Sequence, residues 1–96
     1  MIKVHVDFEG GLENDFNAPK GLDVDVNDGT TLAQLPKILS DKYLGQDKSK
    51  KFISESGNVL NGILVMINDC DAEIEGIDSK LSPNDTITYI TTLHGG

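Results

Sequence analysis

The stretch "IKVHVDFE", residues 2–9, decides the start of the fold, because its apolar residues alternate strictly with polar ones. The apolar set is Ile2, Val4, Val6 and Phe8, and the polar set is Lys3, His5, Asp7 and Glu9. This period of two predicts a strand with one buried face, and it places His5 at the surface. Gly10 and Gly11 then predict a turn.

The residues after this turn predict the second arm of an amino-terminal hairpin. Extended patterning resumes over Leu12 to Phe16, and again at Leu22, Val24 and Val26. Pro19 and Gly21 lie between the two segments, so we expect the second arm to be interrupted.

The period changes in "NDGTTLAQLPKILSDKY", residues 27–43. Leu32, Leu35, Ile38 and Leu39 fall on one face of a helix. Thr31 and Gln34 have the spacing of a capping box, so the helix is predicted to begin there. Pro36 removes a backbone donor, and we therefore expect an irregular start or a kink.

The second half of the chain predicts an ordered connection and further strands. Residues 45–61 are polar and contain glycine, and we expect them to be anchored by Phe52, Ile53, Val59 and Leu60. The apolar run "GILVMIN", residues 62–68, predicts a central strand covered on both faces. A turn and short strand follow in residues 68–76, and a last, central strand is predicted at Thr86 to Thr91. This order predicts an α+β domain in which a mixed sheet wraps over one helix.

Composition restricts the class of protein further. A chain of 96 residues with 38% apolar and 25% charged residues predicts one globular domain. The net charge of -8 disfavours direct binding to nucleic acid and favours basic protein surfaces. The basic cluster Lys48 to Lys51 is interpreted as a solvated loop, with a docking patch as the alternative. We expect no membrane span, no signal peptide and, with Cys70 the single cysteine, a reducing cytoplasmic location with the nucleus as a second one.

Few residues carry recognisable chemistry of their own. Cys70 lies between Asp69 and Asp71, which disfavour its thiolate, so we expect an inert thiol. Asp69, Asp71 and Glu73 alternate like the start of a calcium loop, but Ile74 stands where that loop needs glycine, and no metal site is predicted. Phosphate-binding glycine loops and serine elbows are missing from the sequence, which argues against an enzyme.

The segment "TLHGG", residues 92–96, leaves two interpretations open. Two glycines add nothing to stability, so they fit a frayed end. They also fit a carboxylate arm that threads a narrow tunnel, because residues 92–96 extend about 17 Å. His94 is interpreted as a spacer or recognition residue, since no partner that would orient it lies nearby in sequence.

Three stretches together resemble the ubiquitin-related modifier family of eukaryotes: "TLHGG" at 92–96, "GILVMIND" at 62–69 and "VDFEGGLE" at 6–13. The resemblance covers nearly the whole chain, and His94 stands where ubiquitin has an arginine. Two positions depart from the family pattern: Ala72 replaces a tryptophan and Asn61 a proline, which affects local packing rather than the tail.

The resemblance implies a β-grasp domain over residues 1–91 and a flexible tail over 92–96. It implies that a ubiquitin-activating-type adenylyltransferase with a rhodanese-like domain uses ATP to turn the Gly96 carboxyl into a thiocarboxylate. Leu93, His94 and Gly95 would be recognised by that enzyme, while the chain itself is not an enzyme and binds no cofactor. A tRNA thiolase would take the sulfur, and lysines of target proteins would be a second destination.

Two alternatives remain at this point: a ubiquitin-like interaction module, and a non-catalytic small subunit of a molybdopterin-synthase-like enzyme. For the leading interpretation, a free modifier, we expect a monomer, because no long apolar stripe is left once the strands and the helix are assigned.

Overall fold

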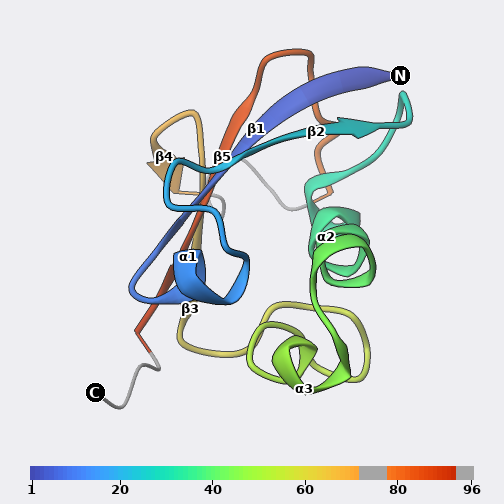
Figure 1. Cartoon of the computed structure of the whole chain (residues 1–96). Coiled ribbons are helices and arrows are strands. Elements are labelled where there is room, and N and C mark those ends of the chain that lie inside the picture. The colour runs from blue at the N-terminus through green and yellow to red at the C-terminus, as the bar shows by residue number, and fades with distance from the viewer. Residues whose placement is uncertain (72–77, 93–96) are drawn as a thin grey trace.

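The computed structural model describes residues 1–71 and 78–92. In this part of the chain five strands form one mixed sheet in the order β2-β1-β5-β3-β4. β1 runs parallel to β5, and the other neighbouring strands are antiparallel. Figure 1 shows the helices gathered on one side of this sheet. The predicted α+β class with a mixed sheet packed on one main helix is confirmed.

The amino-terminal hairpin forms as predicted between β1 (Ile2–Glu9) and β2 (Leu22–Val26). Val4, Val6 and Phe8 are buried, because the strand alternation turns them all to the same face. The predicted extended segment at Leu12 to Phe16 is wrong: α1 (Leu12–Asp15) is a short helix. Leu12 and Phe16 are both buried, and a spacing of four places both on one side of a helical turn.

The main helix has the irregular start that Pro36 predicts. A 3₁₀ turn, η1 (Leu32–Gln34), precedes α2 (Leu35–Tyr43), in which Pro36 occupies the first turn, where its missing N–H is not needed. Thr31 and Gln34 form the predicted capping box, and the Gln34 side-chain oxygen accepts the Thr31 N–H at 3.0 Å.

The connection from Gly45 to Asn61 is ordered and anchored by the predicted residues. It contains the short helix α3 (Gln46–Ser49) and an isolated bridge between Ile53 and Val59. Phe52 is fully buried, and its ring packs edge-on against both Phe16 and Tyr89, with centroids 5.2 Å apart in each case. Aromatic packing therefore fixes this connection to the core.

The interpretation of residues 62–68 as a strand covered on both faces is wrong. β3 (Ile63–Ile67) lies between β5 and β4, and only its Ile63, Val65 and Ile67 side faces the core. Leu64 on the other side is 54% exposed, because the helices that the structure describes cover the opposite face of the sheet. The central strand is β5 (Thr86–Thr91), with the predicted boundaries and position.

The turn predicted after β3 is present. Asn68 and Asp69 both have positive φ, 50° and 67°, and they connect β3 to β4 (Cys70–Asp71) in a tight hairpin. The remainder of the strand predicted within residues 68–76 lies outside the described residues.

Candidate functional site

The candidate site begins where β5 ends, because this strand leads into the predicted carboxylate arm. β5 is hydrogen-bonded to β1 on one side and to β3 on the other. Thr92, the next residue, donates its backbone N–H to the Gly62 carbonyl at 2.8 Å and its hydroxyl to the same oxygen at 2.6 Å. The chain is thus held by the sheet as far as Thr92.

Gly10 lies against the other flank of this exit. Its φ is +77°, and a Cβ at this position would overlap the Thr91 carbonyl oxygen. Only glycine allows the β1 turn to approach the end of β5 so closely. The sequence predicts Gly10 only as part of a turn, because its approach to Thr91 depends on the parallel β1–β5 pairing, which is a long-range contact.

The four residues predicted to react or to be recognised, Leu93, His94, Gly95 and Gly96, lie outside the described residues. Their roles therefore stay predictions. The same holds for the division of the chain at residues 91 and 92, although Thr92 itself is bonded to Gly62.

An apolar patch lies on the outer face of the sheet, away from the helices, and we call it the outer patch: Leu64, Met66 and Ile90. Leu64 faces Ile90 directly in the antiparallel β3–β5 ladder, and both other members are half-buried. Directly opposed residues of such a ladder have Cβ atoms about 4.5–5.5 Å apart, so the exposed Leu64 lies beside Ile90. Since Ile90 comes two residues before Thr92, the outer patch adjoins the exit of the arm.

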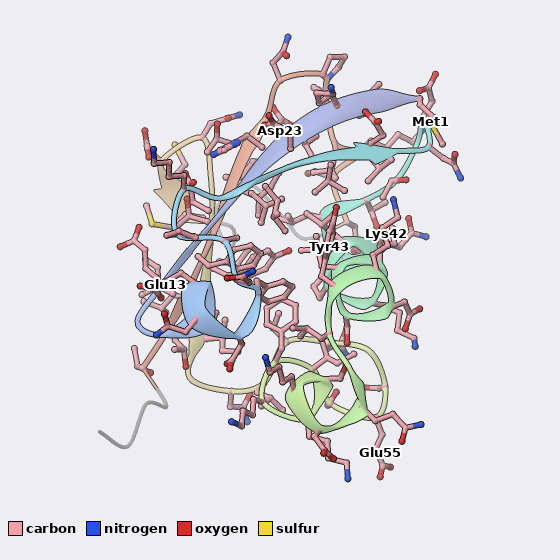
Figure 2. All side chains as sticks on the ribbon, in the orientation of Figure 1. Met1, Glu13, Asp23, Lys42, Tyr43 and Glu55 are labelled. Carbon is pink, nitrogen blue, oxygen red and sulfur yellow. The ribbon has the colours of Figure 1, made fainter. Side chains whose placement is uncertain are left out.

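The outer face also carries four carboxylates, which we call the acidic rim: Asp7 and Glu9 on β1, next to β5, and Asp23 and Asp25 farther from the outer patch on β2. On β1, Asp7 and Glu9 pair with Thr88 and Ile90 of β5, so their carboxylates lie on the same face as the outer patch. Figure 2 shows Asp23 on the side of the sheet opposite α2. The rim gives this face a negative field that suits a basic partner surface.

His5 is held within the rim by two carboxylates. Its Nδ1 lies 2.8 Å from Asp23 Oδ1 and its Nε2 lies 2.8 Å from Asp7 Oδ1. The hydrogen bond with Asp23 raises the pKa of His5, burial opposes this rise, and the bond with Asp7 adds to it. The surface position predicted for His5 is confirmed. Its pairing with Asp7 and Asp23 could not be predicted from sequence spacing, because Asp23 reaches His5 only through the β1–β2 pairing.

The other predicted positions carry little further chemistry in the described part of the chain. Cys70 is exposed, and no group of three or more His, Cys, Asp or Glu among the described residues has the arrangement of a metal site. Two members of the rejected calcium pattern, Glu73 and Ile74, lie outside that part. Lys48, Lys50 and Lys51 are exposed, but Lys48 belongs to helix α3 rather than to the predicted loop. The described helices include none that is long and apolar enough to cross a membrane.

A five-stranded mixed sheet over one main helix, with a central last strand that leads into a glycine-ended arm, defines a ubiquitin-like protein of the β-grasp class. The family model of Urm1 (Ubiquitin related modifier) matches residues 3–96, so the chain belongs to the Urm1 family of small ubiquitin-like modifiers. The family inferred from the sequence, and its fold, are therefore confirmed.

Individual members of the family are similar to this chain over nearly its full length. The chain is 40% identical to the ubiquitin-related modifier 1 homolog of Chlamydomonas reinhardtii, with 100% of both chains covered. It is 35% identical to ubiquitin-related modifier 1 of Yarrowia lipolytica, covering 99% of this chain and 100% of that one. The solution structure of Urm1 from Trypanosoma brucei is similar, with a TM-score of 0.80 at 35% identity, covering 98% of this chain and 95% of that one.

Proposed function

We propose that this chain is a ubiquitin-like sulfur carrier whose Gly96 carboxyl is adenylated, converted to a thiocarboxylate and used in the 2-thiolation of wobble uridine in cytosolic tRNA. The same activated carboxyl is attached to lysines of target proteins in a second activity. The observation that carries the proposal is the Urm1 family match through residue 96. The two hydrogen bonds that fix Thr92, the last described residue, to Gly62 at the edge of the fold support it.

The chemistry requires activation, because a free carboxylate is a poor electrophile. The activating enzyme joins the Gly96 carboxylate to the α-phosphate of ATP and releases pyrophosphate. The terminal sulfur of an enzyme persulfide then attacks the carbonyl carbon and displaces AMP, which gives an acyl disulfide. A second thiol attacks the enzyme sulfur of this disulfide, so that an enzyme disulfide forms and the thiocarboxylate of Gly96 leaves. ATP is the cosubstrate of the partner in this scheme.

The outer patch and the acidic rim supply the proposed docking surface for the activating enzyme. Leu64 offers an exposed apolar contact beside the exit of the arm, and the rim favours a basic complement on the enzyme. The negative charge of this face also fits a division of labour in which the thiolase, rather than this chain, holds the tRNA.

Deletion of Gly95 and Gly96 tests the proposal in cells that carry no other copy of the chain. Thiolation of wobble uridine, measured by the retardation of tRNA in a mercury-containing gel, is expected to disappear while the purified variant keeps its unfolding midpoint. Gly45→Ala is the matched control, since a Cβ at Gly45 meets nothing within 4 Å and its φ of -78° suits any residue.

The results separate the candidate functions. Retained thiolation in the deletion variant contradicts the sulfur-carrier proposal, and unaltered partner binding and phenotype then favour an interaction module. Purification only as a complex of fixed stoichiometry favours a constitutive enzyme subunit. The proposed free carrier is a cytoplasmic monomer, and a sedimentation experiment that shows a dimer at micromolar concentration contradicts that part.

A further inference from the structure

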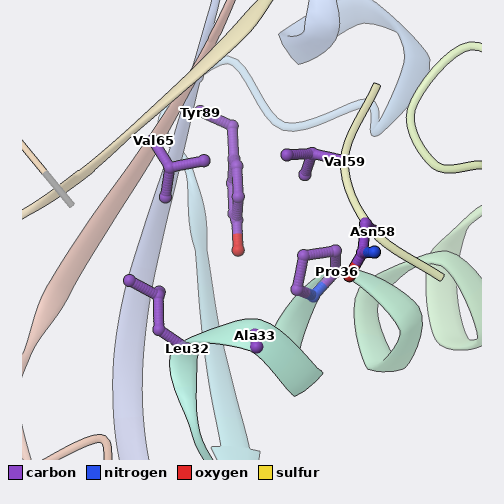
Figure 3. A pocket seen from close by; sticks show the side chains of 7 residues that line it. All are labelled: Leu32, Ala33, Pro36, Asn58, Val59, Val65 and Tyr89. Carbon is purple, nitrogen blue, oxygen red and sulfur yellow. The ribbon is translucent and has the colours of Figure 1, made fainter. Parts of the chain in front are cut away.

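A cavity of about 130 Å³ lies between the inner face of the sheet and the start of the helical segment. Figure 3 shows its lining side chains arranged around a common space. The apolar walls come from η1 and α2, from the connection and from β3: Leu32, Ala33, Pro36, Val59 and Val65. Asn58 is exposed and also belongs to the lining, so the cavity reaches the surface there.

The Tyr89 hydroxyl points into this cavity (Figure 3). The Tyr89 side chain is 0% exposed, and its ring is held edge-on by Phe52, with centroids 5.2 Å apart. Among the residues that the structure describes, the hydroxyl has no hydrogen-bond partner. A buried hydroxyl without a partner is costly, so a donor kept in this position is available for a ligand. Burial also raises the pKa of Tyr89, which keeps the hydroxyl protonated.

The lining restricts what the cavity can hold. A buried water molecule typically needs two to four polar partners, and apart from Tyr89 itself the described lining has one polar side chain, Asn58, where the cavity reaches the surface. None of the described lining residues is charged, and an unpaired ion is strongly disfavoured in apolar surroundings. The volume is slightly below that of a dry protein cavity of about 150 Å³ that binds benzene. The space therefore suits a ring-sized apolar body.

We propose that this cavity is a binding site for a small neutral molecule with a ring-sized apolar body and one hydrogen-bond acceptor, such as a ketone or ether oxygen. The acceptor oxygen receives a hydrogen bond from the Tyr89 hydroxyl, and the ring contacts Val59, Val65 and Pro36. The site is separate from the outer patch, because Val65 and Tyr89 belong to the inner face of the sheet.

Titration of the ¹⁵N-labelled full chain with cyclopentanone, followed by NMR, tests this proposal. Cyclopentanone is neutral, ring-sized and accepts but does not donate a hydrogen bond; pyrrolidinium has the same ring size but carries a charge. The proposal predicts saturable shift changes centred on Ala33, Val59, Val65 and Tyr89 with the ketone, and none there with pyrrolidinium. Tyr89→Phe, which keeps the ring and removes the donor, is expected to weaken binding about three- to tenfold.

Filling the cavity gives a second readout. Ala33→Leu is expected to abolish the saturable changes, and Val65→Ile, which adds one methylene from the opposite wall, serves the same purpose if Ala33→Leu loses the spectrum of a folded protein. Equal affinity of the wild-type chain and Tyr89→Phe overturns the proposal. So do saturable changes centred elsewhere, equal binding of pyrrolidinium, or the lack of saturable changes in the wild-type chain.

Discussion

The two faces of the sheet are built from alternate residues of the same strands, yet they serve different purposes. On the inner face Val4, Val6 and Ile87 are fully buried, and this packing holds β1 and β5 together in parallel. On the outer face Leu64 is 54% exposed beside a rim of carboxylates. Neighbouring residues of one strand therefore have different roles: one contributes to stability through the inner face, and the next is available for partner recognition on the outer face. Substitutions should therefore change one property without the other.

The largest expected effect comes from the inner face. Phe8→Ala removes a buried ring that stacks on Phe16 with centroids 4.0 Å apart, and the free energy of unfolding should fall by about 3–5 kcal/mol. Glu9→Ala, the next residue on the same strand, is the matched control and should stay within about 0.5 kcal/mol of the wild-type chain. Urea unfolding measures both, and equal losses would show that the two faces are not distinct.

Substitution in the outer patch should weaken recognition by the activating enzyme and leave stability unchanged. Leu64→Ala is expected to lower kcat/KM of adenylation by the activating enzyme about tenfold, which corresponds to about 1.4 kcal/mol of lost docking energy. Unfolding should change little, because Leu64 is mostly exposed already.

Tyr43→Ala is the control for this change, since Tyr43 is 40% exposed at the end of α2 and lies outside the outer patch. Equal adenylation of Leu64→Ala and wild-type chains would remove the outer patch from the docking surface.

Tyr89 is an exception on the inner face, because its buried hydroxyl has no hydrogen-bond partner among the residues that the structure describes. Tyr89→Phe should raise the free energy of unfolding by about 1 kcal/mol, since it removes a buried hydroxyl for which the described part of the chain provides no hydrogen bond. A loss of stability in thermal or urea unfolding would show instead that the hydroxyl has a partner in the free protein.

The smallest effect should come from His5 on the outer face. Its raised pKa means that protonated His5 stabilises the fold at low pH, where the contribution is fully present below the ordinary value of 6.5. This contribution to the free energy of unfolding is lost as the pH rises through the raised pKa of His5. Because the side chain is 36% exposed, the loss between about pH 5 and about pH 8 should stay below about 1 kcal/mol.

His5→Gln should remove this part of the pH dependence and leave the rest of the curve unchanged. Urea unfolding of both chains across that range measures it. A wild-type chain that gains stability relative to His5→Gln as the pH rises would contradict the assigned sign.

The sequence predicted those strands and helices whose residue pattern is set by neighbouring residues alone. The alternation of β1 and the boundaries of β5 could be read directly, and Pro36 marked the irregular start of the helix. The prediction for residues 12–16 is wrong because the spacing of Leu12 and Phe16 fits a helical turn as well as an extended segment. The continuous apolar run of β3 concealed that Leu64 is uncovered, since exposure depends on where the helices pack.

The candidate site, too, could be predicted only in part from the sequence. The tail at residues 92–96 was predicted from its two glycines and from the resemblance to a family, and the contacts of Thr92 came only with the structure. The contacts of Thr92 with Gly62, and of Gly10 with Thr91, join segments far apart in sequence. Polar Thr86 and Thr88 alternate with Ile87 and Tyr89 in the last strand, which was the signal that the two faces of the sheet differ, although Thr88 is itself buried.

The intact mass of the purified chain, after incubation with ATP, a sulfide source and the activating enzyme, tests the central claim most directly. The proposal predicts a mass increase equal to the exchange of one oxygen for sulfur, located at Gly96 by fragmentation and lost in the chain without Gly95 and Gly96. An unchanged mass, with the enzyme shown to be competent on another carrier, would contradict the claim that this chain carries sulfur on its carboxyl.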